Sequence, residues 1–217
     1  NFKNKKKLIS FVGKLNSAKG YDIFGKTIIK ILNKHNDWKG IVIGEEPREK
    51  LTFEHKNLIV KGYTKHENVL NLLNKVSISV VCSRWEEPFG RTSLEAASRG
   101  CAVIISNRGG LPETAKNAIV LKSLSINDLY KNIEKLILNE RILRKFQALN
   151  YKNFKFDHKY ISNLIDKIRS TFIVNKAFII KKEKSFKIMH ITNFNERFDG
   201  RLHYNTGRRL NNGFIRN

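Results

Sequence analysis

Six short apolar runs, none with a strict alternation of apolar and polar residues, constrain the fold of this chain more than any other feature. Runs of this kind, bounded by Gly, Asn or Ser, are typical of strands buried on both faces of a parallel sheet. They lie at Leu8–Val12, Ile41–Gly44, Leu58–Val60, Ile78–Cys82, Ala102–Ser106 and Ala118–Leu121.

Segments with apolar residues at helical spacing lie between and after these runs. They are Tyr21–Leu32, Val69–Leu73, Leu129–Ile137 and Ile161–Phe172. Strands that alternate with helices build βαβ units, so the sequence predicts an α/β fold with a Rossmann-like, doubly wound parallel sheet. Ligands of such sheets bind outside the carboxyl ends of the strands.

The chain has 217 residues, which is room for one full domain and a fragment of another. We expect one Rossmann-like domain at 1–175, a basic linker at 176–186, and at 187–217 the truncated start of a second such domain. A basic extension that packs back on the first domain is the alternative for this tail. The chain begins with Asn1 and a charged segment, which favours an internal start over a signal peptide.

The composition is strongly basic, with 42 Lys and Arg against 19 Asp and Glu and a formal net charge of +23. Such a charge suits nucleic acid or an anionic membrane as partner. Because the basic residues are spread along the chain, we expect no nucleic acid and leave contact with anionic lipid open. No apolar run approaches the roughly 18–20 residues that span a bilayer. We therefore expect a cytoplasmic protein, with at most peripheral contact at the inner face of the membrane.

The two cysteines, Cys82 and Cys101, fall inside apolar segments without metal-ligand spacing. They are expected to be buried free thiols. No His pair has ligand spacing either.

The loop and helix start after the fourth run carry the most informative residues. Gly90 lets backbone approach a ligand closely, and the N–H groups of Arg91 and Thr92 at a helix start favour an anion such as phosphate. Glu87 and Glu95 can accept hydrogen bonds from ribose or sugar hydroxyls.

A structural interpretation of the same residues stays open. Thr92-x-x-Glu95 is also a capping-box pattern, in which Glu95 would only satisfy a helix-terminal N–H. Trp85 and Phe89 could equally be packing aromatics.

The segment Arg84–Ala97 resembles the E-x7-E signature of retaining GT-B glycosyltransferases of the family 4 type, with Glu87 and Glu95 in its two positions. The resemblance covers residues 7–172 in the right order. Its other motifs are Phe11-Val12-Gly13-Lys14-Leu15 with Lys19-Gly20, Gly62-Tyr63, and Ser106 to Glu113 with its Gly-Gly-x-Pro-Glu turn. We interpret that last turn as mainly structural.

The resemblance implies a role for each matched residue. Lys14 and Lys19 would hold the donor diphosphate, Glu87 the transferred sugar and Glu95 the ribose, with Lys14, Lys19 and Glu87 taking part in catalysis. The family often has Arg at the position of Lys14, and lysine lacks the bidentate fork of arginine. The full implied donor site is Gly13, Lys14, Lys19, Gly62, Tyr63, Glu87, Phe89, Gly90, Arg91, Thr92 and Glu95, with Gly62 and Tyr63 next to the base.

The resemblance also implies an activity. All matched motifs belong to the C-terminal, donor-binding half of a GT-B enzyme, so we expect a nucleotide-sugar-binding domain with little activity alone. The acceptor, a glycan or a lipid-linked molecule, would bind through an N-terminal domain that does not precede Asn1. The sequence has no Asp-x-Asp motif, so neither a metal nor another cofactor is expected. The alternatives are a GT-B-like epimerase or phosphorylase, and a non-catalytic basic binding module.

Overall fold

The computed structural model describes residues 4–174. The chain divides into two units, Asn1–Tyr160 and Ile161–Asn217. The predicted linker at 176–186 and domain start at 187–217 lie outside the described residues. The predicted boundary at 175 stays a prediction.

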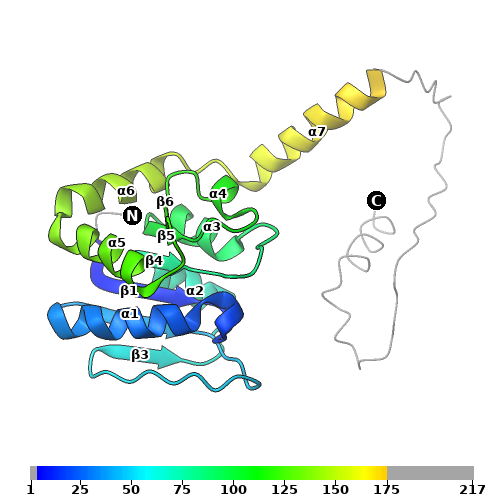
Figure 1. Cartoon of the computed structure of the whole chain (residues 1–217). Helices are drawn as coiled ribbons and strands as arrows, with labels where there is room; N and C mark the ends of the chain where they lie inside the picture. The colour runs from blue at the N-terminus through cyan, green and yellow to red at the C-terminus, as the bar shows by residue number, and fades with distance from the viewer. Residues whose placement is uncertain (1–3, 175–217) are drawn as a thin grey trace. The chain divides into compact units, whose positions relative to one another are not determined.

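A six-stranded parallel sheet in the order β3-β2-β1-β4-β5-β6 forms the centre of the first unit (Figure 1). The chain builds outward from β1 to β3 and then returns to place β4 on the other side of β1. The strand order therefore reverses between β1 and β4, which is where doubly wound sheets bind ligands. The strands are β1 Lys6–Val12, β2 Lys39–Ile43, β3 Leu58–Lys61, β4 Val76–Val81, β5 Ala102–Ile105 and β6 Ile119–Val120.

Helices cover both faces of this sheet because successive residues of a strand point to opposite faces. Val42 of β2 packs in one core cluster with α1 and α5, whereas its neighbours Ile41 and Ile43 pack in a second cluster with α2 and α3. The α/β, Rossmann-like prediction is thereby confirmed. The helices are the 3-10 turn η2 Ser17–Lys19, α1 Tyr21–Lys34, α2 His66–Leu73, α3 Arg91–Ser98, α4 Leu111–Thr114, α5 Ile126–Leu138, α6 Glu140–Lys152 and α7 His158–Val174.

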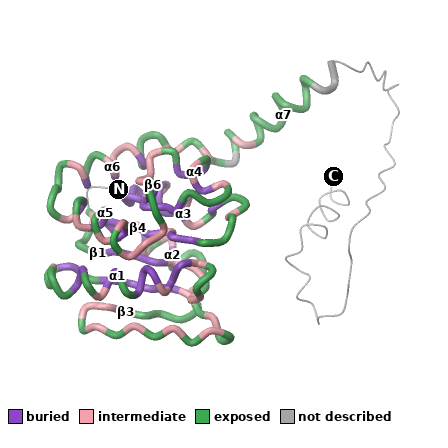
Figure 2. The backbone as a smooth tube through the Cα atoms, in the orientation of Figure 1, coloured by how far each residue is buried: buried purple, intermediate pink, exposed green. Residues whose placement is uncertain are grey.

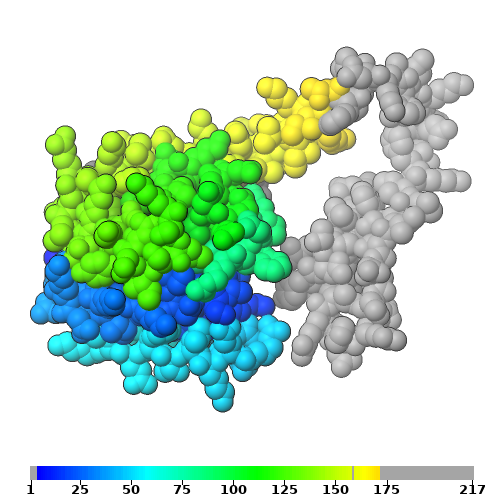
Figure 3. Space-filling view, viewed as in Figure 1, coloured from blue at the N-terminus to red at the C-terminus, as the bar shows by residue number. Residues whose placement is uncertain are grey.

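Burial follows this layering, with the inner strands of the sheet and the inner sides of the helices buried (Figure 2). Helices α1 and α5 pack against each other on one face, where they form the adjoining blue and green surfaces of the space-filling view (Figure 3). Cys82 and Cys101 are both buried and free, as expected.

Two local expectations need correction. Strands β3 and β6 are not buried on both faces, because they are the two edge strands of the sheet. Ile59 and Val60 of β3 are 45% and 49% exposed, and Val120 of β6 is 42% exposed. Helix α6 was not predicted, because polar side chains take part of its buried face. Among these, Gln147 donates to the Ser77 carbonyl at 3.2 Å and Asn150 donates to the Cys101 carbonyl at 2.7 Å.

Helix α7 carries its apolar stripe, including Leu164, Ile165 and Ile168, on an exposed face. None of the helices within the described range combines the length and hydropathy needed to cross a bilayer.

Candidate functional site

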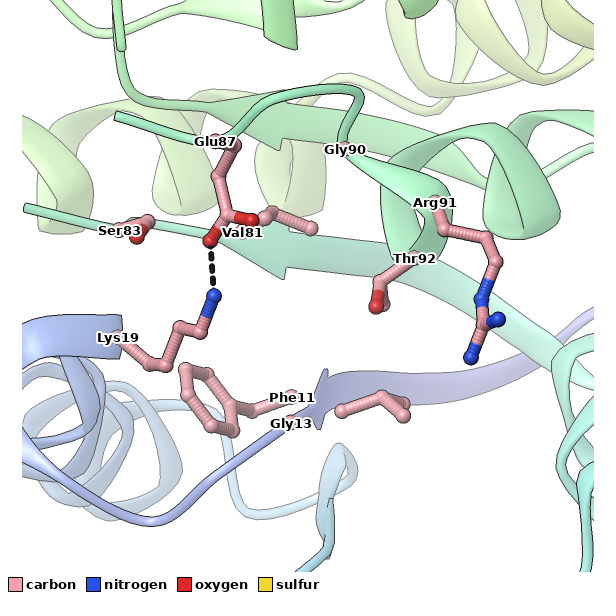
Figure 4. Close-up of a pocket in the computed structure, with 10 residues that line it drawn as sticks. Phe11, Gly13, Lys19, Val81, Ser83, Glu87, Gly90, Arg91 and Thr92 are labelled. Carbon is pink, nitrogen blue, oxygen red and sulfur yellow. Dashed lines mark hydrogen bonds and ion pairs between the residues drawn. The ribbon is translucent and has the colours of Figure 1, made fainter. Parts of the chain in front are cut away.

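A pocket opens at the carboxyl ends of β1 and β4, where the strand order of the sheet reverses (Figure 4). Three segments meet there: the end of β1 with the loop that follows it, the end of β4, and the start of α3. The lining residues are Phe11, Val12, Gly13, Lys19, Val81, Ser83, Glu87, Gly90, Arg91 and Thr92.

The loop between β1 and α1 places Lys19 in this pocket. Its short 3-10 turn is capped by Asn16, whose side-chain oxygen accepts the Lys19 N–H at 3.0 Å. The β4–α3 loop holds the same turn, because the N–H groups of Arg84 and Trp85 donate to the Ala18 carbonyl at 2.8 and 3.1 Å. The backbone that carries Lys19 is therefore fixed before any ligand arrives.

Carboxylates brace this loop from outside the pocket. Asp22 accepts hydrogen bonds from Nη1 and Nη2 of Arg84 at 2.6 and 2.7 Å, and this contact lowers the pKa of Asp22. Glu46 accepts hydrogen bonds from Arg48 and from the side chain of Asn16, and these hydrogen bonds, chiefly those from Arg48, lower the pKa of Glu46 to about 2. Both acids stay ionised at neutral pH.

Gly20 ends the turn in a conformation that requires glycine. Its φ is +75°, and a Cβ at this position would lie 1.9 Å from the carbonyl oxygen of Cys82.

We expect Gly20→Ala to lower the free energy of unfolding by about 2 kcal/mol or more, because alanine at this φ is strained and its Cβ would clash with the backbone. Urea unfolding would measure the loss. Gly62→Ala is the matched control, because a Cβ on Gly62 meets only a Glu45 oxygen at 3.9 Å; an equal loss in both variants would contradict the argument.

Lys19 and Glu87 form an ion pair inside the pocket, with Nζ 2.5 Å from Oε1 (Figure 4). Their side chains are 31% and 14% exposed, so the pair is partly withdrawn from water but open to the pocket. A lysine ammonium in this position can also bind a phosphate oxygen. A phosphate ligand would have to compete with Glu87 for it.

The start of α3 forms the opposite wall. Gly90 is its N-cap with φ +73°, and a Cβ there would lie 2.6 Å from Leu111, so the backbone approaches α4 closely. No side chain caps this end, which leaves the N–H groups of Arg91 and Thr92 available to an anion. Thr92 itself lines the pocket.

The turn at Gly109-Gly110 supports the Glu87 segment from behind. Gly110 donates its N–H to the Glu87 carbonyl at 2.7 Å, and a Cβ on Gly109, whose φ is +51°, would lie 2.3 Å from the same oxygen. Pro112 lies in the first turn of α4, as expected from its position after the glycines. These contacts agree with a structural role for the turn.

Glu95 lies one turn into α3 with its carboxylate turned toward α2. Its Oε1 is 2.9 Å from Nε2 of His66 and 3.4 Å from Nε of Arg91. The capping-box interpretation is therefore wrong, because Gly90 is the N-cap and the Glu95 side chain pairs with His66.

The predicted site residues separate into two groups. Gly13, Lys19, Glu87, Gly90, Arg91 and Thr92 line the pocket together, whereas Lys14, Gly62, Tyr63, Phe89 and Glu95 do not. Lys14, Tyr63 and Phe89 are exposed, Tyr63 to 77%. The roles of both groups stay predictions.

Four lining residues were not predicted as site residues. They are Phe11, Val12, Val81 and Ser83, at or just beyond the ends of β1 and β4. Their places at the ends of two strands that flank a reversal of strand order would have identified them. Within residues 4–174, no group of three or more His, Cys, Asp or Glu lies close enough to hold a metal ion.

Comparison with known proteins supplies the family. The family model for glycosyl transferases group 1 matches residues 1–153. The spore coat protein SA of Bacillus subtilis is 29% identical over 154 residues, which are 60% of this chain and 41% of that protein. The GPI3 subunit of the phosphatidylinositol N-acetylglucosaminyltransferase of Saccharomyces cerevisiae is 29% identical over 168 residues, 73% of this chain and 35% of that one. The chain thus spans less than half the length of either relative.

Solved structures agree with the fold. The C-terminal domain of a glycosyl transferase group 1 family protein, LpcC of Francisella tularensis, superposes with a TM-score of 0.59 at 26% identity, covering 67% of this chain and 82% of that one. Anabaena HepE in complex with UDP-glucose superposes with a TM-score of 0.61 at 16% identity, covering 76% of this chain and 49% of that one. The sheet thus matches those of GT-B glycosyltransferases, and the chain belongs to the group 1 glycosyltransferases.

Proposed function

We propose that this chain binds a nucleoside diphosphate sugar and is the donor-binding part of a retaining, metal-independent glycosyltransferase of the family 4 type. One observation carries the proposal. A lysine ammonium, a carboxylate and the uncapped start of a helix meet in one pocket at the reversal of strand order. The HepE structure in complex with UDP-glucose, a protein of the same fold, supports the choice of ligand class.

The chemistry of the pocket suits departure of a nucleoside diphosphate. Negative charge grows on the diphosphate as the bond between sugar and phosphate breaks, and the Lys19 ammonium can neutralise it at the pocket wall. The backbone N–H groups at the start of α3 can also donate hydrogen bonds to the diphosphate, and because they belong to the helix, no side chain has to be ordered when the ligand binds. Glu87, released from Lys19, can then accept a hydroxyl of the transferred sugar.

The acceptor in this proposal is a glycan or a lipid-linked molecule bound through a further domain. GPI3, which covers the largest share of this chain among the relatives named above, is a subunit of a transferase named for phosphatidylinositol. The net charge of +23 suits work next to anionic lipid. In this proposal the protein acts in the cytoplasm, with at most peripheral contact at the inner face of the membrane.

Calorimetric titration of the chain with UDP, GDP and ADP, and with their sugar conjugates, tests the donor site. We expect saturable binding of one nucleotide, with the same affinity in the presence and absence of EDTA, because the site supplies its own positive charge. Binding that EDTA abolishes would overturn metal independence. Absence of binding to all three nucleotides by the folded chain would overturn the donor site itself.

A further inference from the structure

The contact between Glu95 and His66 joins α2 to α3, the helix whose first residues line the pocket. Glu95 belongs to α3 and His66 is the first residue of α2, and Nε2 of the imidazole lies 2.9 Å from Oε1 of the carboxylate. A carboxylate at neutral pH only accepts hydrogen bonds, so the imidazole is the donor. The contact spans 29 positions of sequence, and it is set by the packing of α2 on the sheet.

The packing of α2 fixes the position of the His66 backbone, from which the imidazole extends. Val69 and Leu73 of α2 are buried in the second core cluster, which also includes Ala96 and Ala97 of α3. The two helices therefore share one apolar layer. The backbone of His66 is held by α2, while its side chain remains 62% exposed and reaches toward α3.

The contacts of Glu95 are one-sided. His66 and Arg91 both reach Oε1, at 2.9 and 3.4 Å, and among the described residues no hydrogen bond reaches Oε2. The Glu95 side chain is only 16% exposed, so its second oxygen is largely withdrawn from bulk water, one helical turn beyond the residues of α3 that line the pocket. One oxygen is thus held by protein, and the other is left to accept from a ligand.

We propose that His66 is a positioning residue for the ribose of the donor, holding Oε1 of Glu95 so that Oε2 accepts ribose hydroxyls. The inference rests on the proposed function and on the ribose role that the family resemblance implies for Glu95. His66 restrains the Glu95 carboxylate more strongly than Arg91 does, because its contact is shorter and the Arg91 side chain is 81% exposed. His66 does not need to touch the donor.

The test separates a ribose effect from general damage by using ligands with and without the ribose hydroxyls. Binding of UDP, GDP and ADP, and of their 2′,3′-dideoxy analogues, is measured by calorimetry for the wild-type chain, His66→Ala and His66→Gln. We expect His66→Ala to weaken the ribonucleotide that binds by about 10-fold, as for loss of one hydrogen bond to a charged group, and to leave its dideoxy analogue within about twofold.

Two further variants sharpen the result. His66→Gln should retain most of the affinity, because the glutamine amide can place a donor near the position of the imidazole Nε2. In a Glu95→Gln background, His66→Ala should have little further effect, since the two residues act through one contact. His55→Ala is the control: it removes a histidine that pairs with Asn33 at 3.2 Å, and it should leave the preference for ribonucleotide unchanged.

The outcomes distinguish the inference from the proposed function. An unchanged or tighter affinity of His66→Ala for the ribonucleotide, or an equal loss for both ligand types, would overturn the positioning role while leaving the donor site intact. If the wild-type chain binds none of the three nucleotides, the donor site fails and the inference fails with it.

Discussion

Replacement of Lys19 by alanine is expected to weaken binding of a nucleoside diphosphate by about 30-fold. Two effects combine in this result. The pocket loses the ammonium that neutralises the diphosphate, worth about 1.5–3 kcal/mol for a hydrogen bond to a charged group. Glu87, whose Oε1 lies 2.5 Å from that ammonium, is left facing the phosphates as an unpaired anion. Calorimetric titration of both proteins with the nucleotide that the wild-type chain binds measures the change.

A matched control is essential, because the chain carries a net charge of +23 and any lysine attracts an anion weakly. Lys131→Ala removes the same charge from an exposed position of α5 and should change the affinity by less than about twofold at near-physiological salt. Equal losses in Lys19→Ala and Lys131→Ala would mean that the nucleotide responds to overall charge and that the pocket is not its site.

The same titration distinguishes the two lysines of the predicted basic pair. Lys14 is exposed and does not line the pocket, whereas Lys19 is held there by the capped turn that ends at Gly20. On this geometry Lys14→Ala should cost less affinity than Lys19→Ala. A larger effect at Lys14 would show that the loop rearranges when the donor binds.

The strands of this fold could be predicted from the sequence because parallel strands buried on both faces leave unbroken apolar runs. Edge strand β3 has such a run too, and its exposure at Ile59 and Val60 follows only from the strand order. Helix α6 escaped prediction for the opposite reason. Its buried Gln147 and Asn150 bond to backbone carbonyls of other segments, so these two positions interrupt the apolar stripe that begins with Ile142, Leu143 and Phe146.

The candidate site was predictable where a motif is local. Gly90 and the helix start after it are adjacent in the sequence, and a glycine before a helix start is a readable pattern. The partner of Glu95 could not be predicted from a local motif. His66 lies far from Glu95 in the sequence, and only the packing of α2 beside α3 brings the imidazole to the carboxylate. Thr92-x-x-Glu95 fits a capping box equally well until that packing is known.

Glu87→Gln is expected to change the affinities for nucleotide and nucleotide sugar in opposite directions. Glu87 pairs with Lys19 at 2.5 Å and is only 14% exposed, so a phosphate that binds Lys19 must displace it. The amide of glutamine is neutral and competes less for the ammonium, and its carbonyl does not repel the phosphates as a carboxylate does. The nucleoside diphosphate should therefore bind about 3–10-fold more tightly to the variant.

The sugar conjugate should bind more weakly to the same variant, by about 3-fold or more, because a neutral amide accepts a sugar hydroxyl less strongly than a carboxylate does. The ratio of the two dissociation constants is the informative quantity, and it should change by about 10-fold or more. Glu113→Gln, an exposed acid of α4 outside the pocket, is the control and should leave that ratio unchanged. If Glu87→Gln shifts both ligands by the same factor, Glu87 acts only through Lys19 and does not touch the sugar. The opposite shifts would instead show that one carboxylate serves two states, as partner of Lys19 in the absence of a diphosphate and as acceptor of the sugar when the diphosphate takes its place.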